Sequence, residues 1–430
     1  MRFYHKVFFS LSSNHSIMAG SRLRLSIPLH YQILIMLLAG GLIGYFFPGV
    51  TVYTNWLGEI FLRALNMIIV PLIFCSITTG VASVGSSGNL GRLGLKTMGF
   101  YIFSTLVAIL TGLVLVNTIK PGIGADLGFI EPVKGIAAQS DSFSQTLIKI
   151  VPTNIIEALA QGQMLSIIFF SILFGYFLTR IGEKPGRLLT DVINSILDVI
   201  MKITMLIIKL APLGIFSITA KVIAQQLING NGIEEILSRL GLYMLTVLAG
   251  ILFHFLITLS LAMKLIGKVN PIKHLRNMAT PLLTAFSTSS SNATLPVSME
   301  AVENNDGVSN KIASFTLPLG ATINMNGTAL YECVAVVFIA QAYGIDLSLG
   351  QQMIVVFTSL LAAIGSAGIP MAGLVMMAVV LRAVGLPLEG IGLLLAVDRI
   401  LDMFRTTLNV YGDTCAAVVI AKSEGEKLKI

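Results

Sequence analysis

The last apolar stretch of this sequence, between Ile391 and Ala421, contains an unusual row of polar residues. Its members recur every three or four residues, which on a helix of about 100° per residue confines them to an arc of roughly 80°. They are Asp398, Asp402, Arg405, Asn409 and Asp413. Ionisable residues within membrane segments are rare and by default functional. Acids outnumber arginine in this row, so we expect it to bind cations or protons.

The residue types in this row suit an amino acid that has an acidic side chain. The planar guanidinium of Arg405 can bind a carboxylate through two parallel hydrogen bonds. Asp402 can accept an ammonium group, and the amide of Asn409 can donate to a second carboxylate. The alternative is a chain of salt bridges between successive helical turns, in which the charged groups only satisfy one another.

A second group of polar residues lies between Asn324 and Glu332. Asn324, Asn326 and Gly327 in the middle of a membrane segment predict locally unwound backbone. The carbonyl and amide oxygens of such a segment suit a hard cation such as Na⁺. Glu332 could carry a proton, and the alternative is a protonated glutamic acid that is hydrogen-bonded in the core.

The elements that hold these residues are predicted to be membrane helices. Hydrophobic residues make up 55% of the 430 residues and charged residues only 11%, whereas soluble domains are about 25% charged. Basic residues gather in alternate connections, so we expect a multi-pass protein of the cell membrane with both termini in the cytoplasm. The net charge of +7 therefore does not indicate nucleic-acid binding. All three cysteines lie in apolar stretches, which predicts no disulfide framework.

The expected fold is all-α, with eight transmembrane helices and two interrupted segments. We expect the spans near residues 29–47, 56–84, 94–118, 153–180, 190–226, 238–266, 308–342 and 388–421. The segments 271–300 and 350–384 contain a serine-rich and a glycine-rich tract, respectively. Bare backbone cannot face lipid, so both are predicted to be re-entrant hairpins that line a binding site. The alternative, that the small residues only allow close helix packing, explains one such tract better than two.

Four motifs in this order resemble those of the dicarboxylate/amino acid:cation symporter family, which includes archaeal aspartate transporters and excitatory amino-acid transporters. The motifs are Ser289–Pro296, Asn324–Thr328, Gly365–Gly373 and Asp402–Asp413, and the likeness extends from about residue 30 to 422. The resemblance implies a homotrimer in the lipid bilayer, built from inverted repeats and working as an elevator.

The same resemblance implies a division of each subunit into parts. A scaffold would comprise residues 28–90 and 152–228, and a transport domain residues 91–120 and 236–421. The remaining parts would be a cytoplasmic N-terminal segment (1–27), a loop (121–151) and a cytoplasmic tail (422–430).

The resemblance also implies roles for individual residues in binding the substrate. Asp402 would bind the amino group and Asn409 the α-carboxylate. Arg405, together with Thr328, would bind the side-chain carboxylate. Further residues of the pocket would be Ser289, Ser291, Ile369, Gly373 and Thr406.

Coupling ions, rather than an organic cofactor, are implied in up to three cation sites. The first would use the Gly320 carbonyl, Asn324, Asn409 and Asp413. The second would use backbone near Thr322, Met325 and Ser366. The third would use Tyr101, Ser104, Thr105 and Asn324.

This chain departs from the family pattern at the third cation site. The family usually has aspartate at the position of Asn326, so a carboxylate is missing there, which puts coupling to three Na⁺ in doubt. Glu332 stands where proton-linked relatives carry glutamate, which keeps proton symport open.

The leading interpretation is a secondary active symporter of aspartate or glutamate that is coupled to Na⁺, H⁺ or both. One alternative is a four-carbon dicarboxylate symporter of the same fold, against which Asp402 argues because such a substrate has no ammonium group. Another, from a different class, is an ion channel, which would not explain two gated hairpins. The sequence contains no HExxH or GxSxG pattern, so we do not expect an enzyme.

Overall fold

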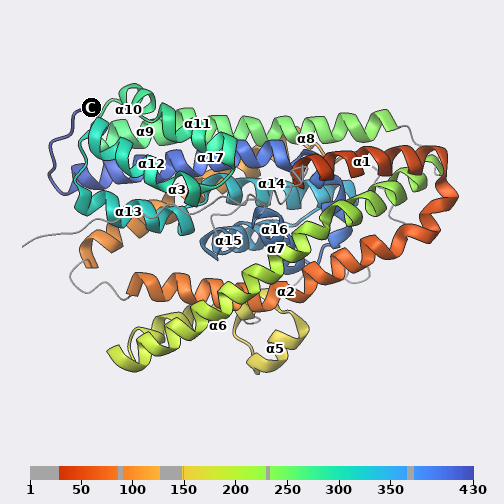
Figure 1. Cartoon of the computed structure of the whole chain (residues 1–430), viewed down its shortest axis with the longest axis horizontal. Coiled ribbons are helices and arrows are strands. Elements are labelled where there is room, and N and C mark those ends of the chain that lie inside the picture. Colours follow the sequence, from red (N-terminus) through yellow and green to blue (C-terminus); the bar gives the residue numbers. More distant parts are fainter. Residues whose placement is uncertain (1–28, 86–90, 126–147, 149, 229–232, 366–371) are drawn as a thin grey trace, which may run out of the picture.

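The computed structural model describes residues 29–85, 91–125, 148, 150–228, 233–365 and 372–430 (Figure 1). Within these ranges all regular structure is helical, which confirms the predicted all-α class. The helices fall into two groups, one formed mostly by the first half of the chain and the other by the second half. One helix of the first half packs within the second group.

The first group contains α1 (Leu29–Phe46), α2 (Thr51–Gly85), α6 (Met164–Leu178) and α7 (Glu183–Ile228). The long helix α7 packs along both α1 and α2, and α2 also packs against α6. Gly40 and Gly44 of α1 allow a close approach, because a Cβ atom on either would lie 2.4 Å from a backbone oxygen of α7. Small residues four apart are a common means by which membrane helices pack.

One predicted span, 153–180, is wrong as a single helix. The segment forms α5 (Ile155–Gln161) and α6, which begins only at Met164. The Asn154 side chain caps the start of α5 by accepting a hydrogen bond from the Ile156 amide at 2.9 Å. Gly162 then takes a left-handed conformation with φ of 65°, which ends α5 in the way that glycine commonly ends helices.

The second group surrounds α14 (Asn326–Ala342), in which every residue as far as Ala340 is buried. Its neighbours are α3 (Gly91–Ile119), α8 (Ile233–Phe253), α15 (Leu349–Gly365), α16 (Ala372–Ala383) and α17 (Ile391–Ser423). α13 (Asn310–Ile323) leads into α14 and packs on α17. α8 continues through α9 (Leu259–Ala262), with a π-helical turn on each side at His254–Thr258 and Met263–Gly267.

Each interrupted segment contains two helices that pack against each other, which agrees with the predicted hairpins. The first begins with α10 (Pro271–Asn277), continues with α11 (Ala279–Thr288) and α12 (Ser291–Ala301), and ends in a π-helical turn at Val302–Asp306. α11 and α12 pack against each other and against α17. In the second segment α15 packs against α16, and its tip, residues 366–371, lies outside the described residues.

Among the described residues, five helical stretches are long and apolar enough to cross a membrane by length and composition. They span Pro48–Ala82, Arg92–Ile119, Glu183–Gln225, Leu237–Gly267 and Asn310–Ala342. α17, which carries the polar row, is not among them. The membrane class is therefore supported, whereas the number of eight crossings stays a prediction.

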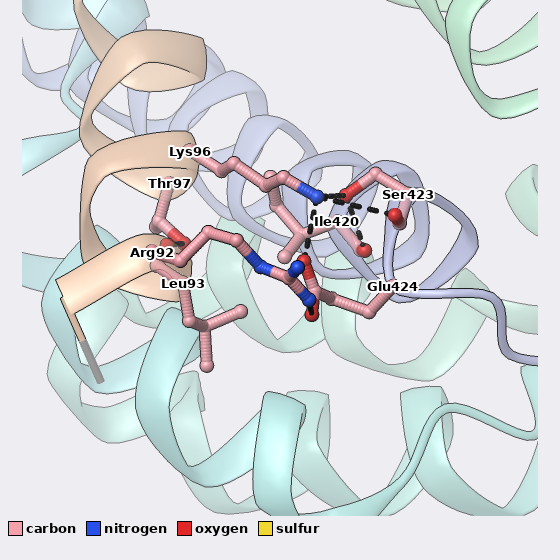
Figure 2. Close-up of polar contacts among 7 residues, drawn as sticks. All are labelled: Arg92, Leu93, Lys96, Thr97, Ile420, Ser423 and Glu424. Atoms are coloured by element: carbon pink, nitrogen blue, oxygen red, sulfur yellow. Dashed lines mark hydrogen bonds and ion pairs between the residues drawn. The ribbon is translucent and has the colours of Figure 1, made fainter. Parts of the chain in front are cut away.

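The end of α17 is linked to the start of α3 through polar contacts of Ser423 and Glu424 (Figure 2). Lys96 Nζ donates to Glu424 Oε1 at 2.6 Å and to the Ser423 backbone oxygen at 3.1 Å, and Arg92 pairs with the other oxygen of Glu424. These partners lower the pKa of the Glu424 carboxyl, first through the hydrogen bond from Lys96 and then through that from Arg92. The ends of α3 and α17 are thus linked by charge.

We expect Glu424→Gln to lower the thermal unfolding temperature of the detergent-solubilised protein at neutral pH. A carboxyl whose pKa is lowered by folding stabilises the protein above its ordinary pKa, and this contribution is lost as the pH falls through the folded value. The difference in unfolding temperature from wild type should therefore shrink in acid. It should also shrink at high salt, because the ion pair of Arg92 and Glu424 is accessible to solvent. Glu300→Gln, at an exposed position of α12, is the matched control. A difference that is the same at every pH would contradict the ionic link.

Candidate functional site

The guanidinium of Arg405 is the centre of the polar row on α17. Only 1% of the side chain is exposed. Its Nη2 donates to Asp398 Oδ1 at 3.0 Å and to Asp402 Oδ1 at 2.9 Å. The guanidinium carbon also lies 3.8 Å from the centroid of the Tyr331 ring of α14. Two carboxylates and an aromatic face thus compensate one buried cation.

Nη1 of Arg405 lies beside the second interrupted segment. Nε and Nη1 are buried and have no hydrogen-bond partner among the described residues. A Cβ atom on Gly373, near the start of α16, would lie 3.1 Å from Nη1 and 3.2 Å from the Thr328 methyl group. Nη1 and Nε do not share an edge of the guanidinium, because both edges with two parallel N–H bonds include Nη2. The unpaired N–H groups are therefore single donors, and those of Nη1 lie beside Gly373.

Asp402 takes part in a second charge contact. Its Oδ2 lies 3.7 Å from Nη1 of Arg399, and its Oδ1 accepts from Arg405. The sequence indicates no individual role for Asp398 beyond its place in the polar row, and none for Tyr331, yet the structure places both against Arg405. Asp398 was visible as a member of the row, but no spacing pattern indicated that Tyr331 of another helix faces it.

The predicted unwinding is confirmed at Asn324 and Met325, whereas Asn326 and Gly327 already belong to the next helix. α13 ends at Ile323 and α14 begins at Asn326, with non-helical backbone at Asn324 and Met325. The first amide groups of a helix lack partners within it. Here Asn409 of α17 supplies one, because its Oδ1 accepts from the Gly327 amide at 2.8 Å. Its Nδ2 lies 3.3 Å from the Thr328 hydroxyl, to which it donates.

Most residues of the first predicted cation site lie close to Asp413. Asn324 Nδ2 donates to Asp413 Oδ1 at 2.8 Å, while Asn324 Oδ1 is buried without a partner among the described residues. A Cβ atom on Gly320 would lie 2.4 Å from Asp413 Oδ1 and 2.6 Å from the Tyr101 hydroxyl. The carboxylate and the amide oxygen are ligand types that hard cations prefer, so these residues fit a Na⁺ ion.

Asn326 joins two of the residues predicted for the third cation site. Its Nδ2 donates to Ser104 Oγ at 2.7 Å, and its Oδ1 accepts from Thr105 Oγ1 at 2.7 Å. Both ends of the amide are therefore engaged. A Cβ atom on Gly412 would lie 2.9 Å from Asn326 Nδ2 and 3.0 Å from Asn324 Nδ2, so the first and third predicted sites adjoin each other.

The residues predicted for the second cation site, and the rest of the predicted pocket, show fewer contacts with one another. Thr322 is exposed and its hydroxyl donates to the Leu319 oxygen at 3.0 Å, whereas Met325 is buried. Ser366 and Ile369 lie outside the described residues. The second cation site is therefore not assembled by the part of the chain that the structure describes. Three remaining residues of the predicted pocket are buried: Ser289, Ser291 and Thr406.

Glu332 is fully buried on α14, next to Tyr331. Neither of its carboxyl oxygens has a hydrogen-bond partner among the described residues. No described residue thus provides the hydrogen bond that the alternative, a protonated glutamic acid bonded in the core, requires. An unpaired carboxylate in such surroundings is costly in its charged form, which suits a group that takes up a proton.

Comparison with known proteins gives a consistent result over almost the whole chain. Residues 29–423 match the model of the sodium:dicarboxylate symporter family. The chain is 37% identical to human excitatory amino acid transporter 3, covering 88% of this chain and 80% of the relative. It is 36% identical to the proton/sodium-glutamate symport protein of Geobacillus stearothermophilus, covering 93% and 95%. It is also 36% identical to the proton/glutamate-aspartate symporter of Escherichia coli, covering 92% and 93%.

We expect Asp398→Asn to lower the free energy of unfolding by about 2 kcal/mol, because a charge-assisted hydrogen bond to buried Arg405 is replaced by a neutral one. Denaturant titration in detergent micelles measures this change. Asp198→Asn, at an exposed position of α7, should stay within about 0.5 kcal/mol of wild type. Equal stability of Asp398→Asn and Asp198→Asn would mean that Asp402 and Tyr331 alone compensate the guanidinium.

Proposed function

Because the chain belongs to the sodium:dicarboxylate symporter family, we propose that it is a secondary active symporter of acidic amino acids driven by Na⁺, protons or both. The observation that carries this proposal is the buried guanidinium of Arg405, whose donors are only partly used. Nη2 donates to Asp398 and Asp402, whereas Nη1, beside Gly373, and Nε have no partner among the described residues. A substrate carboxylate is the group that suits these unpaired donors best.

The acids around Arg405 favour an amino acid over a four-carbon dicarboxylate. Asp402 lies beside the guanidinium and offers a carboxylate to an ammonium group. In place of the ammonium group, the second carboxylate of a dicarboxylate would lie beside Asp398 and Asp402 and be repelled by their negative charges. The names of the bacterial relatives, which mention glutamate and aspartate, agree with this choice.

The coupling cation would bind beside Asp413. Asn324, Gly320 and Tyr101 surround its carboxylate, and no organic cofactor is part of the proposal. A bound Na⁺ would offset the excess of acids on α17 and thereby favour an anionic substrate. Such coupling is reciprocal, so the substrate would raise the affinity for the cation by the same factor.

We further propose the quaternary arrangement and the movement that the family resemblance implies. The protein would be a homotrimer in the cell membrane, with both termini in the cytoplasm. Packing of α1, α2, α6 and α7 with one another supports a scaffold of residues 28–90 and 152–228. The group around α14 would form the transport domain, residues 91–120 and 236–421, which moves as an elevator.

The test of the function is uptake of radiolabelled aspartate into proteoliposomes, with a Na⁺ gradient and a proton gradient imposed separately. We expect uptake under at least one gradient and its loss in Arg405→Ala, because the substrate carboxylate loses its partner. Uptake that only protons drive would assign coupling to Glu332, and Glu332→Gln should then abolish it. Uptake of succinate but not aspartate would instead assign the protein to dicarboxylates, and a gradient-independent flux would indicate a channel.

We expect Asn326→Asp to make uptake more sensitive to Na⁺. The change adds a carboxylate between Ser104 and Thr105, where the present amide is neutral and fully engaged, and anionic oxygen ligands raise cation affinity. The Na⁺ concentration for half-maximal uptake should fall, or the dependence should become steeper. Asn117→Asp, on the same helix as Ser104 but bonded to Gln352, is the control. An unchanged Na⁺ dependence would show that this position takes no part in coupling.

A further inference from the structure

A buried histidine–aspartate pair joins the two ends of the first interrupted segment. His274 lies on α10, where the segment begins, and Asp306 ends the π-helical turn with which it closes. His274 Nδ1 lies 2.6 Å from Asp306 Oδ2, and neither side chain is exposed. Asn277 Nδ2 donates to the other oxygen, Oδ1, at 2.7 Å. Both oxygens of this carboxylate are thus engaged.

Both ring nitrogens of His274 lie at hydrogen-bond distance from a partner. Nδ1 faces Asp306 Oδ2. Nε2 lies 3.1 Å from Thr414 Oγ1, whose own hydroxyl donates to the Tyr411 backbone oxygen at 2.9 Å. His274 therefore bridges Asp306 and Thr414 of α17.

Through Thr414 this pair reaches the candidate cation site. Thr414 follows Asp413 directly on α17, and Asp413 accepts the hydrogen bond from Asn324. The ring of His274 also lies 5.5 Å from that of Tyr411. The pair thus contacts α17 on both sides of Gly412 and Asp413, so it fixes the position of this turn of the helix.

The C-terminal residues cover the pair. The Lys429 amide donates to the Asp306 backbone oxygen at 2.8 Å, and Lys429 Nζ donates to the Asn304 oxygen at 2.7 Å. Lys273, the neighbour of His274, donates to the Lys429 backbone oxygen at 3.1 Å. The tail, whose Glu424 is fastened to α3 (Figure 2), thereby holds the closing turn of the first segment in place.

We propose that His274 is a positioning residue for the cation site at Asp413: it holds Thr414, and with it the neighbouring turn of α17, against both ends of the first interrupted segment. This inference rests on the function proposed above. Groups that orient the ligands of a metal ion through hydrogen bonds influence the affinity for the cation without contacting it themselves. If the contacts of His274 served stability alone, their removal would leave the dependence on Na⁺ unchanged.

The test compares His274→Phe, Thr414→Val and the double variant with wild type. The Na⁺ concentration that gives half-maximal thermal stabilisation of the detergent-solubilised protein reports cation binding without transport. We expect this concentration to rise about tenfold in each single variant. In the double variant it should rise no further, because both changes break the same link. Arg276→Gln, an exposed residue of α10, is the matched control and should leave it unchanged.

Aspartate uptake into proteoliposomes completes the test. At saturating Na⁺ the maximal rate of each single variant should stay within about twofold of wild type, because the substrate groups are untouched. Unchanged Na⁺ dependence in His274→Phe and Thr414→Val, with a responsive wild type, would overturn the inference and leave the proposed function intact. Wild-type protein that neither takes up aspartate nor responds to Na⁺ would overturn both. If His274→Phe does not fold, Thr414→Val decides, because it keeps the His274–Asp306 pair.

Discussion

A guanidinium that cannot lose its proton is buried in the middle of an apolar bundle, and much of the molecule is arranged to compensate it. Arg405 needs anionic partners at hydrogen-bond distance, which α17 provides one and two turns earlier with Asp402 and Asp398. The remaining face of the guanidinium packs on Tyr331 of α14. Removing one member of such a pair costs more than forming the pair gains. The need to compensate Arg405 therefore determines how α14 and α17 lie against each other. The other helices of the second group pack on these two.

The broken helix between α13 and α14 imposes a second constraint on the same pair of helices. Its freed amide groups need partners away from water, and Asn409 provides one by accepting from Gly327. This contact requires the backbones to approach closely. A Cβ atom on Gly327 would lie 2.7 Å from the Arg405 backbone oxygen, so glycine is required there. The break thus brings oxygen ligands beside Asp413 and at the same time brings Thr328 and Asn409 beside Arg405.

The sequence was sufficient to predict the polar face of α17 and the break at Asn324, because spacing and residue type determine both. It could not predict contacts between distant elements. The span at 153–180 was wrong because a single left-handed residue, Gly162, divides it. Tyr331 and the His274–Asp306 pair were missed because their partners lie on other elements, and helical periodicity says which face a residue occupies but not which neighbour it meets. The roles given to individual ligands stay predictions.

The charges of the site explain why a carrier of this construction would need cations. Asp398 and Asp402 already share Arg405, and Asp413 has only neutral partners among the described residues that bond to it. An acidic amino acid adds one more net negative charge to this enclosed region. Because charge is far more costly in an apolar surrounding than in water, the substrate binds favourably only when a cation or proton arrives with it. Under the proposed function, coupling would then follow from electrostatics at the site itself, since each ligand raises the affinity for the other. A neutral Asn326 would reduce the number of cations that bind with the substrate.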